Sequence, residues 1–446
     1  MRIFFFLCSI FLFAPSAAAL DLLEAYHRAQ NYDAQFTAAR STLDAERERL
    51  PQARAALLPS LSLGGQSTLN DNRTRSPHAL RQEDRYNSHS YGLTLTQPLF
   101  RRENFVAYEQ GERVALMAEI RFAEAEQNLI LRVAEAYLAV LDAQSTLEAA
   151  QSQKEAIAQQ LEQARHYFEA GVATIIDTTE AESRHDLALA QEIAGINELE
   201  IRREALYVLI GETTETLARL RGDLSQTLPS PNTIAPWVES AQKGNLAVQI
   251  AEYEADIADL EIARANAGHY PTLDIVANVG KSRSRNNSGE RPTNETNNIG
   301  LQWSMPLFSG GYVSSKAREA AANRHAALAL LEAARRGAAL AARQNFLGVV
   351  NGLAQIRALS AALASSLTSL EQNKTGYEIG VRINIDVLNA EQQVFTTRRD
   401  LTRARHETLL ARLRLKNAVG TLSEQDLAEV NALLDNNAPS PQPPSP

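Results

Sequence analysis

The distribution of proline restricts the fold of this chain more than any other feature. None of its 16 prolines falls within residues 99–228 or 307–438. Proline is the residue that most reliably stops a helix, because its ring fixes φ and removes a backbone donor. Both proline-free blocks are also rich in Ala, Leu, Glu, Gln and Arg, which favour helix. The sequence therefore predicts two blocks of very long helices.

A seam of mostly apolar residues runs through each block, with alternating spacings of four and three that are typical of a coiled coil. The first seam is Leu129, Val133, Ala136, Val140, Ala143, Leu147, Ala150, Lys154, Ile157, Leu161, Ala164 and Phe168. The second is Ile356, Leu359, Leu363, Ser366, Leu370, Asn373 and Tyr377, continued from Val387 to Leu415. The first helix is expected over 101–170, roughly 100 Å long at about 1.5 Å per residue.

Each block contains one point where the chain is predicted to turn back. Gly171 and Gly380 stand 209 positions apart, and each is followed six positions later by an aspartate, Asp177 or Asp386. Glycine commonly ends a helix because it adopts the left-handed conformation without a steric penalty. We predict that these helix-turn glycines close two helical hairpins that are copies of each other.

This duplication predicts a tandem repeat. The expected divisions are repeat 1 at 20–228 (helix, strand hairpin 60–97, long helical hairpin), repeat 2 at 229–437 (helix, strand hairpin 272–305, long helical hairpin) and a disordered proline-rich tail at 438–446. The leading helices are expected over 21–58, with a break at Pro51, and over 237–267. The return helices are expected to run out near Leu228 and Leu433.

The N-terminus has the three-part pattern of a secretory signal peptide, expected over residues 1–19. Arg2 precedes a long apolar run, and small residues up to Ala19 offer a cleavage site. The only cysteine, Cys8, lies in that run, so the exported chain is expected to have no disulfide, thiolate metal site or lipidated cysteine. No later stretch is expected to supply the 18 or so apolar residues of a transmembrane helix. A membrane could then be crossed only by strands.

Between the leading helices and the long helices the apolar period changes to two, in four segments of about ten residues. Their apolar positions are Leu61, Leu63, Tyr91, Leu93, Leu95, Leu273, Ile275, Ala277, Val279, Ile299, Leu301, Trp303 and Met305. Membrane β-strands have this length and pattern, although a soluble hairpin with one wet face alternates in the same way. Residues 70–90 and 281–298 are expected to be polar loops joining the strands. The signal peptide, these loops and aromatic residues near the strand ends favour the membrane interpretation.

Each strand pair is followed by the same three residues, Pro-Leu-Phe, at Pro98 to Phe100 and at Pro306 to Phe308. Proline there is expected to end the strand and begin the helix, since its fixed φ suits a first helical turn. Pro98, Phe100, Pro306 and Phe308 mark the predicted strand-helix junctions.

Four strands cannot line a membrane pore, because an open sheet would present unpaired backbone groups to lipid. The fold class predicted is therefore a mixed α/β membrane protein whose barrel closes only by oligomerisation. A dimer would supply eight strands and a trimer twelve, and geometry alone does not choose between them.

The chain resembles the TolC outer-membrane channel-tunnel family over about residues 21–432. The resemblance lies in the order of elements, the doubled Pro-Leu-Phe and the segments 153–157, 268–274 and 420–427. The resemblance implies a homotrimer with one twelve-stranded barrel continued by a coiled-coil periplasmic tunnel. It also implies a passive exit duct for drugs or unfolded proteins. Its implied partners are a periplasmic adaptor, an inner-membrane RND or ABC pump, and outer-membrane lipid.

The resemblance also implies a gate at the far end of the tunnel. Arg382 and Asp177 match the family's ion pair between hairpins, and Tyr377 matches an aromatic hydrogen-bonding residue for which Gln160 is the expected partner. Asp386 matches an aspartate at the lumen constriction. Simpler explanations remain open: a carboxylate in a first helical turn is stabilised by the helix dipole, and an exposed ion pair contributes only about 0–1 kcal/mol.

Position 389 departs from the family, because many members carry a second aspartate there and this chain has Asn389. A trimer would expose three gate carboxylates from this motif instead of six. We expect cations to concentrate at the mouth but to plug it less tightly.

Other function classes are disfavoured. The sequence has no nucleophile elbow, P-loop, His-Glu-x-x-His or cysteine framework, so no enzyme, cofactor or metal site is predicted. The net charge of −9 and the lack of a basic cluster argue against nucleic acid. The alternative is an exported coiled-coil adaptor in the periplasm, which would leave the four strand patterns unexplained.

Overall fold

The computed structural model describes residues 19–76, 79–172, 174–212, 216–221, 228–284 and 290–435. The predicted signal peptide, apart from Ala19, and the predicted tail lie outside these residues. The chain forms two compact units. The first consists of the described parts of Met1–Ala38, Ala125–Asn245 and Ala338–Pro446, and the second of those of Ala39–Glu124 and Leu246–Gly337. Each unit draws on both halves of the chain, so neither coincides with a predicted repeat.

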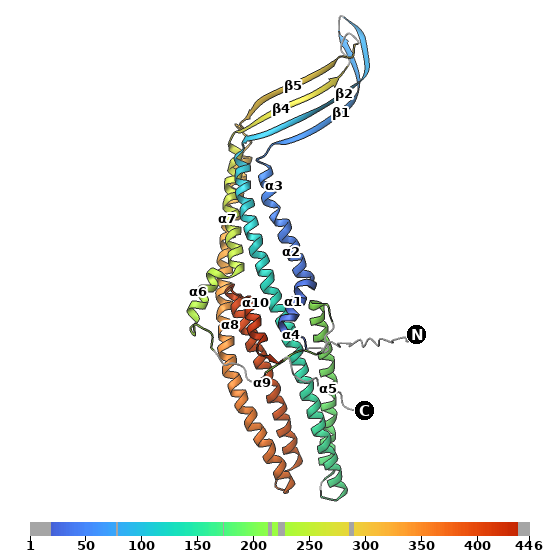
Figure 1. The fold of residues 1–446 in the computed structure, drawn as a ribbon, viewed down its shortest axis with the longest axis vertical. Coiled ribbons are helices and arrows are strands. Elements are labelled where there is room, and N and C mark those ends of the chain that lie inside the picture. Colours follow the sequence, from blue (N-terminus) through green and yellow to red (C-terminus); the bar gives the residue numbers. More distant parts are fainter. Residues whose placement is uncertain are drawn as a thin grey trace, which may run out of the picture. The chain divides into compact units, whose positions relative to one another are not determined.

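The second unit contains a four-stranded antiparallel sheet. Its strands are β1 (Ser60–Ser76), β2 (Ala79–Phe100), β4 (Thr272–Arg283) and β5 (Thr293–Ser304), in the order β1-β2-β4-β5 (Figure 1). The central β2–β4 ladder joins two hairpins that are far apart in sequence. β1 and β5 are the edge strands.

The register of this sheet separates apolar from polar side chains. One row across the four strands is Leu61, Leu95, Ala277 and Ile299, and the next positions along the same face include Leu63, Leu93, Val279 and Leu301. On the other face, Thr94 Oγ1 lies 2.8 Å from Asn278 Oδ1, and Asn278 Nδ2 donates to Asn298 Oδ1 at 3.0 Å. The apolar face is uncovered in the single chain, where Ile299 is 77% exposed. The alternation therefore produces one continuous apolar face.

The expected loops at 70–90 and 281–298 are largely strand, so that prediction is wrong. β1 and β2 stay paired as far as Ser76 and Ala79, and β4 reaches Arg283. Opposite charges face each other across these polar stretches: Arg85 and Asp71 lie 2.9 Å apart, and Lys281 and Glu295 lie 2.6 Å apart. Cross-strand ion pairs stabilise a ladder without apolar residues. The period-two pattern of apolar residues therefore underestimates the length of these strands.

The leading helix is broken at positions other than Pro51. It forms α1 (Leu22–Tyr32), α2 (Ala34–Arg47) and α3 (Arg49–Ala55), with breaks at Asp33 and Glu48. Pro51 is the third residue of α3, where the backbone N–H would have no partner inside the helix in any case. The counterpart in the second half forms α6 (Ile234–Gly244), α7 (Leu246–Asn266) and the short 3₁₀ helix η1 (Ala267–His269). In the second unit, Arg121 bonds Glu46 and Glu254, at 3.2 and 3.0 Å.

The four longest helices are α4 (Arg102–Glu169), α5 (Ile175–Ile210), α8 (Tyr312–Glu378) and α9 (Asn384–Ala418). Predicted seam positions that are buried include Leu129, Val133, Val140, Ala143, Ala150, Ile157, Leu161, Ala164, Ile356, Val387, Val394, Leu401, Ala404 and Leu415. The hairpins therefore pack along the predicted seam.

The return helices end earlier than expected. α5 stops at Ile210 because Gly211 takes a left-handed φ of 76°. α9 stops at Ala418, Gly420 follows with φ of 75°, and α10 (Glu424–Asn431) begins a separate helix. Glycine, not the more distant proline-rich segment, sets both ends.

Helix α8 contains an 18-residue window with mean hydropathy 1.4, of which 22% is buried. By length and composition it could cross a membrane, so the expectation of no such stretch beyond the N-terminus is wrong.

The middle of the first unit ties Leu20, Ala218 and the last described strand to the long helices. β3 (Arg219–Leu220) pairs with β6 (Leu434–Asp435). The buried Tyr137 hydroxyl of α4 contacts the carbonyls of Leu20 and Ala218, each at 2.9 Å. Burial raises the pKa of Tyr137. This residue therefore remains a neutral structural link.

A buried ion pair in the same unit predicts sensitivity to acid. Arg132 donates two hydrogen bonds to the Asp33 carboxylate, both 2.9 Å, and lowers its pKa. A carboxylate whose pKa is lower in the folded than in the unfolded protein stabilises the fold at pH values above its unfolded pKa of about 3.9. This stabilisation is lost as the pH falls through the folded pKa. We expect Asp33→Asn to remove about 1–3 kcal/mol at neutral pH and to flatten the loss of stability below about pH 4. Denaturant titrations from neutral to acid pH measure both.

Asp44→Asn is the control, because Asp44 has a 70% exposed side chain and only a 3.8 Å pair with Arg47. Equal acid sensitivity of wild type and Asp33→Asn would contradict the assignment.

Candidate gate at the tips of the helical hairpins

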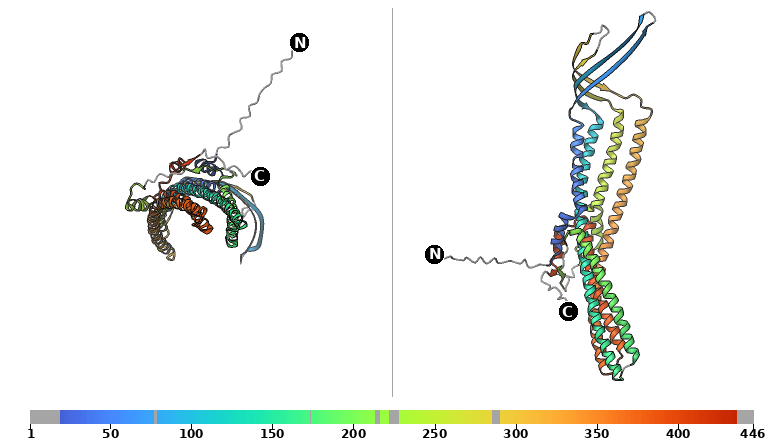
Figure 2. Two further views of the ribbon diagram at one scale, coloured as in Figure 1. Left: turned by 90° about the horizontal axis from the view of Figure 1, so that it is seen from below. Right: turned by 90° about the vertical axis from the view of Figure 1, so that its right-hand side faces the viewer.

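Two turns, α4–α5 and α8–α9, lie at the same end of the first unit (Figure 1, Figure 2). Gly171 has φ of 74° and Gly380 has φ of 77°. Val172 N–H bonds the Tyr167 carbonyl at 2.9 Å, and Val381 N–H bonds the Gly376 carbonyl at 2.8 Å. These six-to-one bonds and left-handed glycines make both turns Schellman motifs. Gly171 and Gly380 therefore hold the same conformation in both hairpins.

The helices that follow the two turns begin differently. In the first hairpin, Thr174 and Asp177 form a capping box, with Thr174 N–H and Oγ1 bonding Asp177 Oδ2 at 2.9 and 2.7 Å. In the second hairpin the N-cap is Ile383, which has no side-chain cap. Asp386 instead lies 3.7 Å from Arg382. Equivalent aspartates therefore have different partners, and within one chain Arg382 faces Asp386 and not Asp177.

Tyr377 contacts a residue that the sequence did not single out. Its ring lies 6.1 Å from that of Tyr167, tilted by 44°. Gln163 donates to the Tyr167 hydroxyl at 3.2 Å. Burial, ahead of the neighbouring Tyr167 and Asp177, raises the pKa of Tyr377. The Gln160 amide oxygen is buried and has no hydrogen-bond partner among the described residues of the single chain.

Two equivalent ion pairs brace the hairpins internally. Lys374 lies 3.1 Å from the buried Glu391, and Arg165 lies 3.6 Å from Glu182. Lys374 and Arg165 stand 209 positions apart, as do Glu391 and Glu182. This matching offset is the sequence signal that could have found them.

The two hairpins also contact each other near their tips. Arg184 of α5 donates from Nη2 to Asn389 Oδ1 of α9 at 3.3 Å. Ile157, Ala188 and Leu388 form a buried apolar cluster there, and Gln153 donates to Gln392. Asn389 therefore has a defined partner on the other hairpin.

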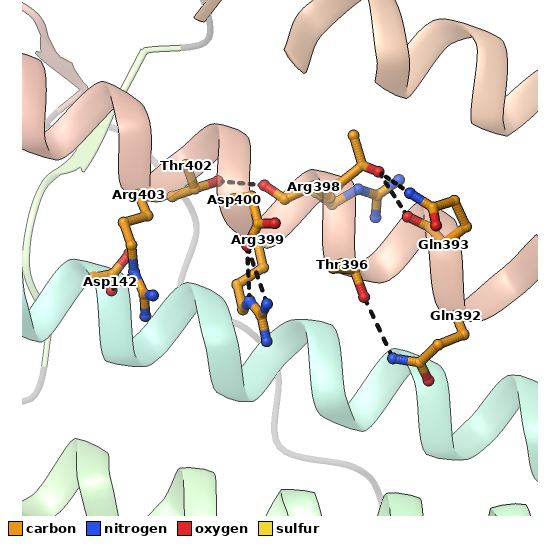
Figure 3. A network of polar contacts seen from close by, with 10 residues as sticks. Asp142, Gln392, Gln393, Thr396, Arg398, Arg399, Asp400, Thr402 and Arg403 are labelled. Atoms are coloured by element: carbon orange, nitrogen blue, oxygen red, sulfur yellow. Dashed lines mark hydrogen bonds and ion pairs between the residues drawn. The ribbon is translucent and has the colours of Figure 1, made fainter. Parts of the chain in front are cut away.

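Farther along α9 the polar contacts continue toward α4 (Figure 3). Gln392 bonds Thr396 at 3.4 Å, and Arg403 lies 3.6 Å from Asp142 of α4. His406 also lies 3.6 Å from Asp142. Burial raises the pKa of Asp142, but the contacts with His406 and Arg403 outweigh it, and the pKa is lowered. These polar residues of α9 lie next to the contact between the two hairpins.

The strand-helix junctions lie in the second unit and differ from each other. Pro98 is within β2, which continues to Phe100 past a ladder irregularity, so it does not end the strand. Its ladder partner is the buried Asp274, which accepts two hydrogen bonds from Arg101 at 2.9 and 2.7 Å. The second junction, between the end of β5 at Ser304 and the start of α8 at Tyr312, contains Pro306 and the exposed Phe308.

No cluster of three or more His, Cys, Asp or Glu that could hold a metal ion occurs among the described residues.

Comparison with known proteins identifies the chain's relatives. It is 33% identical over 420 residues to the outer membrane protein TolC of Vibrio cholerae, covering 93% of this chain and 94% of that protein. It is also 33% identical to the alkaline protease secretion protein AprF of Pseudomonas aeruginosa, covering 95% and 89%. The outer membrane protein VceC of Vibrio cholerae shares the fold, with a TM-score of 0.76, 18% identity and coverage of 90% and 96%.

The family described as outer membrane efflux protein matches residues 25–212 and 237–421 of the chain. These ranges include both hairpin tips and all four strands of the large sheet. The chain therefore belongs to the outer membrane efflux protein family.

Proposed function

We propose that this chain is the outer-membrane exit duct of a tripartite efflux pump or type I secretion system, and that it passively passes drugs or unfolded proteins out of the cell. The observation that carries the proposal is the continuous, uncovered apolar face of the four-stranded sheet. Family membership supports it, because the relatives are outer-membrane efflux and secretion proteins and not enzymes. The alternative of a periplasmic adaptor is not favoured, since it leaves that face without a role.

The finer architecture is a homotrimer with a twelve-stranded barrel. β1 and β5 are edges whose outer backbone groups would be unsatisfied in lipid. Pairing β1 of one copy with β5 of the next satisfies them, and three copies close the barrel. The long hairpins then form a coiled-coil tunnel in the periplasm. A periplasmic adaptor and an inner-membrane RND or ABC pump complete the proposed assembly.

The tandem repeat follows from the same proposal. The repeats at 20–228 and 229–437 each supply one strand hairpin and one helical hairpin, so every chain contributes twice to both barrel and tunnel.

The hairpin tips are the proposed gate. Arg382 leaves Asp386 to reach Asp177 of a neighbouring chain, and Tyr377 bonds Gln160, whose buried amide oxygen lacks a partner among the described residues of the single chain. Asp386 then faces the lumen at the constriction, next to Asn389. Gly171 and Gly380 hold the turns, and Pro98, Phe100, Pro306 and Phe308 lie where barrel and tunnel join.

The gate is tested by the double substitution Arg382→Ser with Tyr377→Phe. It removes one ion pair and one hydroxyl contact per chain, each worth about 0.5–1.5 kcal/mol. Because three copies add, we expect single-channel conductance in planar bilayers to rise at least several-fold.

The control is Arg336→Ser, which removes an exposed cation bonded only within α8, to Glu332 at 2.8 Å. A conductance of the double variant equal to that of this control would contradict the gate. Failure of the wild type to form channels would contradict the duct itself.

A further inference from the structure

Arg184 makes a contact between the two helical hairpins that the sequence did not indicate. Its Nη2 atom lies 3.3 Å from Asn389 Oδ1, whereas its nearest carboxylate, Glu180 on the same helix, is 3.9 Å away. The Arg184 side chain is 35% exposed. The asparagine on α9 is therefore the shorter contact, and it crosses from one hairpin to the other.

This contact lies beside the gate aspartate. Asp386 and Asn389 are three residues apart on α9, so their side chains occupy the same face of the helix. Because Arg184 bonds Asn389, its guanidinium lies against the face of α9 that also carries Asp386. Asp386 also has Arg382 at 3.7 Å.

Arg184 places a positive charge beside Asn389, and Glu180 lies 3.9 Å away on the same helix. In the proposed gate Arg382 leaves Asp386 for Asp177 of a neighbouring chain, whereas Arg184 stays beside Asn389. A multivalent cation approaching Asp386 would be repelled by Arg184 at short range, where screening by salt is incomplete.

We propose that Arg184 is a gate residue with two effects. Its bond to Asn389 holds α5 against α9 and resists opening, and its charge weakens cation binding at Asp386. The inference rests on the proposed function, because it takes Asp386 to face the duct. Asn389 then has two roles: its side-chain oxygen accepts the hydrogen bond that positions Arg184, and it adds no carboxylate to the gate.

Planar-bilayer recordings of the full-length protein test both effects, with the trivalent lanthanum ion as the blocking probe. Arg184→Gln removes the charge and weakens the hydrogen bond to Asn389. Because a modest hydrogen bond is then lost in each of three copies, we expect conductance to rise at least about twofold. Lanthanum block should become at least about tenfold tighter. Asn389→Asp retains a partner for Arg184 and adds a carboxylate, so block should tighten while conductance stays at the wild-type value.

The matched control is Arg203→Gln, because Arg203 is also on α5, is 38% exposed and pairs with Glu200 at 3.2 Å on the same helix. Conductance or block of Arg184→Gln equal to that of Arg203→Gln overturns the proposal. If Arg184→Gln does not assemble, raised conductance or unchanged block in Asn389→Asp overturns it. Wild-type protein without channel activity refutes the duct, and channels without these shifts refute only the role of Arg184.

Discussion

Replacing Ile299 by arginine is expected to prevent stable assembly in the membrane. Ile299 is 77% exposed and lies in the row with Leu61, Leu95 and Ala277. On a soluble protein such a surface substitution would change stability by no more than about 0.5 kcal/mol. On the lipid face of a barrel an arginine costs about 2–4 kcal/mol near the midplane, once in every chain. We expect the wild type to form the detergent-requiring oligomer of the proposed duct in outer-membrane extracts, and the variant to lose it.

The control is Thr296→Arg, which places the same charge on the polar face of the same strand, in register with Gly280. It should assemble like the wild type. An Ile299→Arg oligomer that is as abundant as that of Thr296→Arg and dissociates at the same temperature would rule out lipid contact at this face.

Replacing Arg101 by methionine is expected to loosen the point where β4 meets the start of α4. Asp274 has a side chain only 7% exposed, and Arg101 holds both of its carboxylate oxygens. Loss of the partner leaves a buried charge, which costs 3–5 kcal/mol when both groups are buried; Arg101 is 41% exposed, so we expect about 2–3 kcal/mol. This corresponds to roughly 30- to 140-fold faster amide exchange at the ends of β4 and α4.

Arg102→Met removes a neighbouring guanidinium that makes no ion pair among the described residues, and it should leave this exchange unchanged. Exchange rates that do not distinguish the two variants would show that the Arg101–Asp274 pair does not stabilise the junction.

The strands and long helices were predictable because their signals are local and repeated. Leu93 and Leu95 alternate with threonine, and the α4 seam keeps its spacing over eleven intervals. The β2–β4 pairing was not predictable, because nothing in either strand specifies its distant partner. The polar ends of the hairpins were missed because ladder bonds and pairs such as Arg85–Asp71 stabilise strands without an apolar signal.

The residues of the candidate gate were also predictable only where their signal is local. Gly171 and Gly380 were predictable because a helix end needs a left-handed residue. Arg184 was not, since an arginine on an exposed helical face is usually solvated and its partner lies on another hairpin. The different partners of Asp177 and Asp386 depend on Thr174 in one turn and Ile383 in the other, a difference visible in the sequence once the caps are considered.

The order of strands in the sheet also constrains how the chain can acquire its structure. β1 with β2, and β4 with β5, are local hairpins, but the bond between Thr94 and Asn278 closes a separation of 184 residues. Closing so long a loop carries an entropic cost that local hairpins do not, and such contacts form slowly. Until β4 is available, β2 has no neighbour on one side, and its bare edge is open to aggregation. The β2–β4 pairing therefore makes the first strand hairpin the segment with the longest interval of edge exposure during folding.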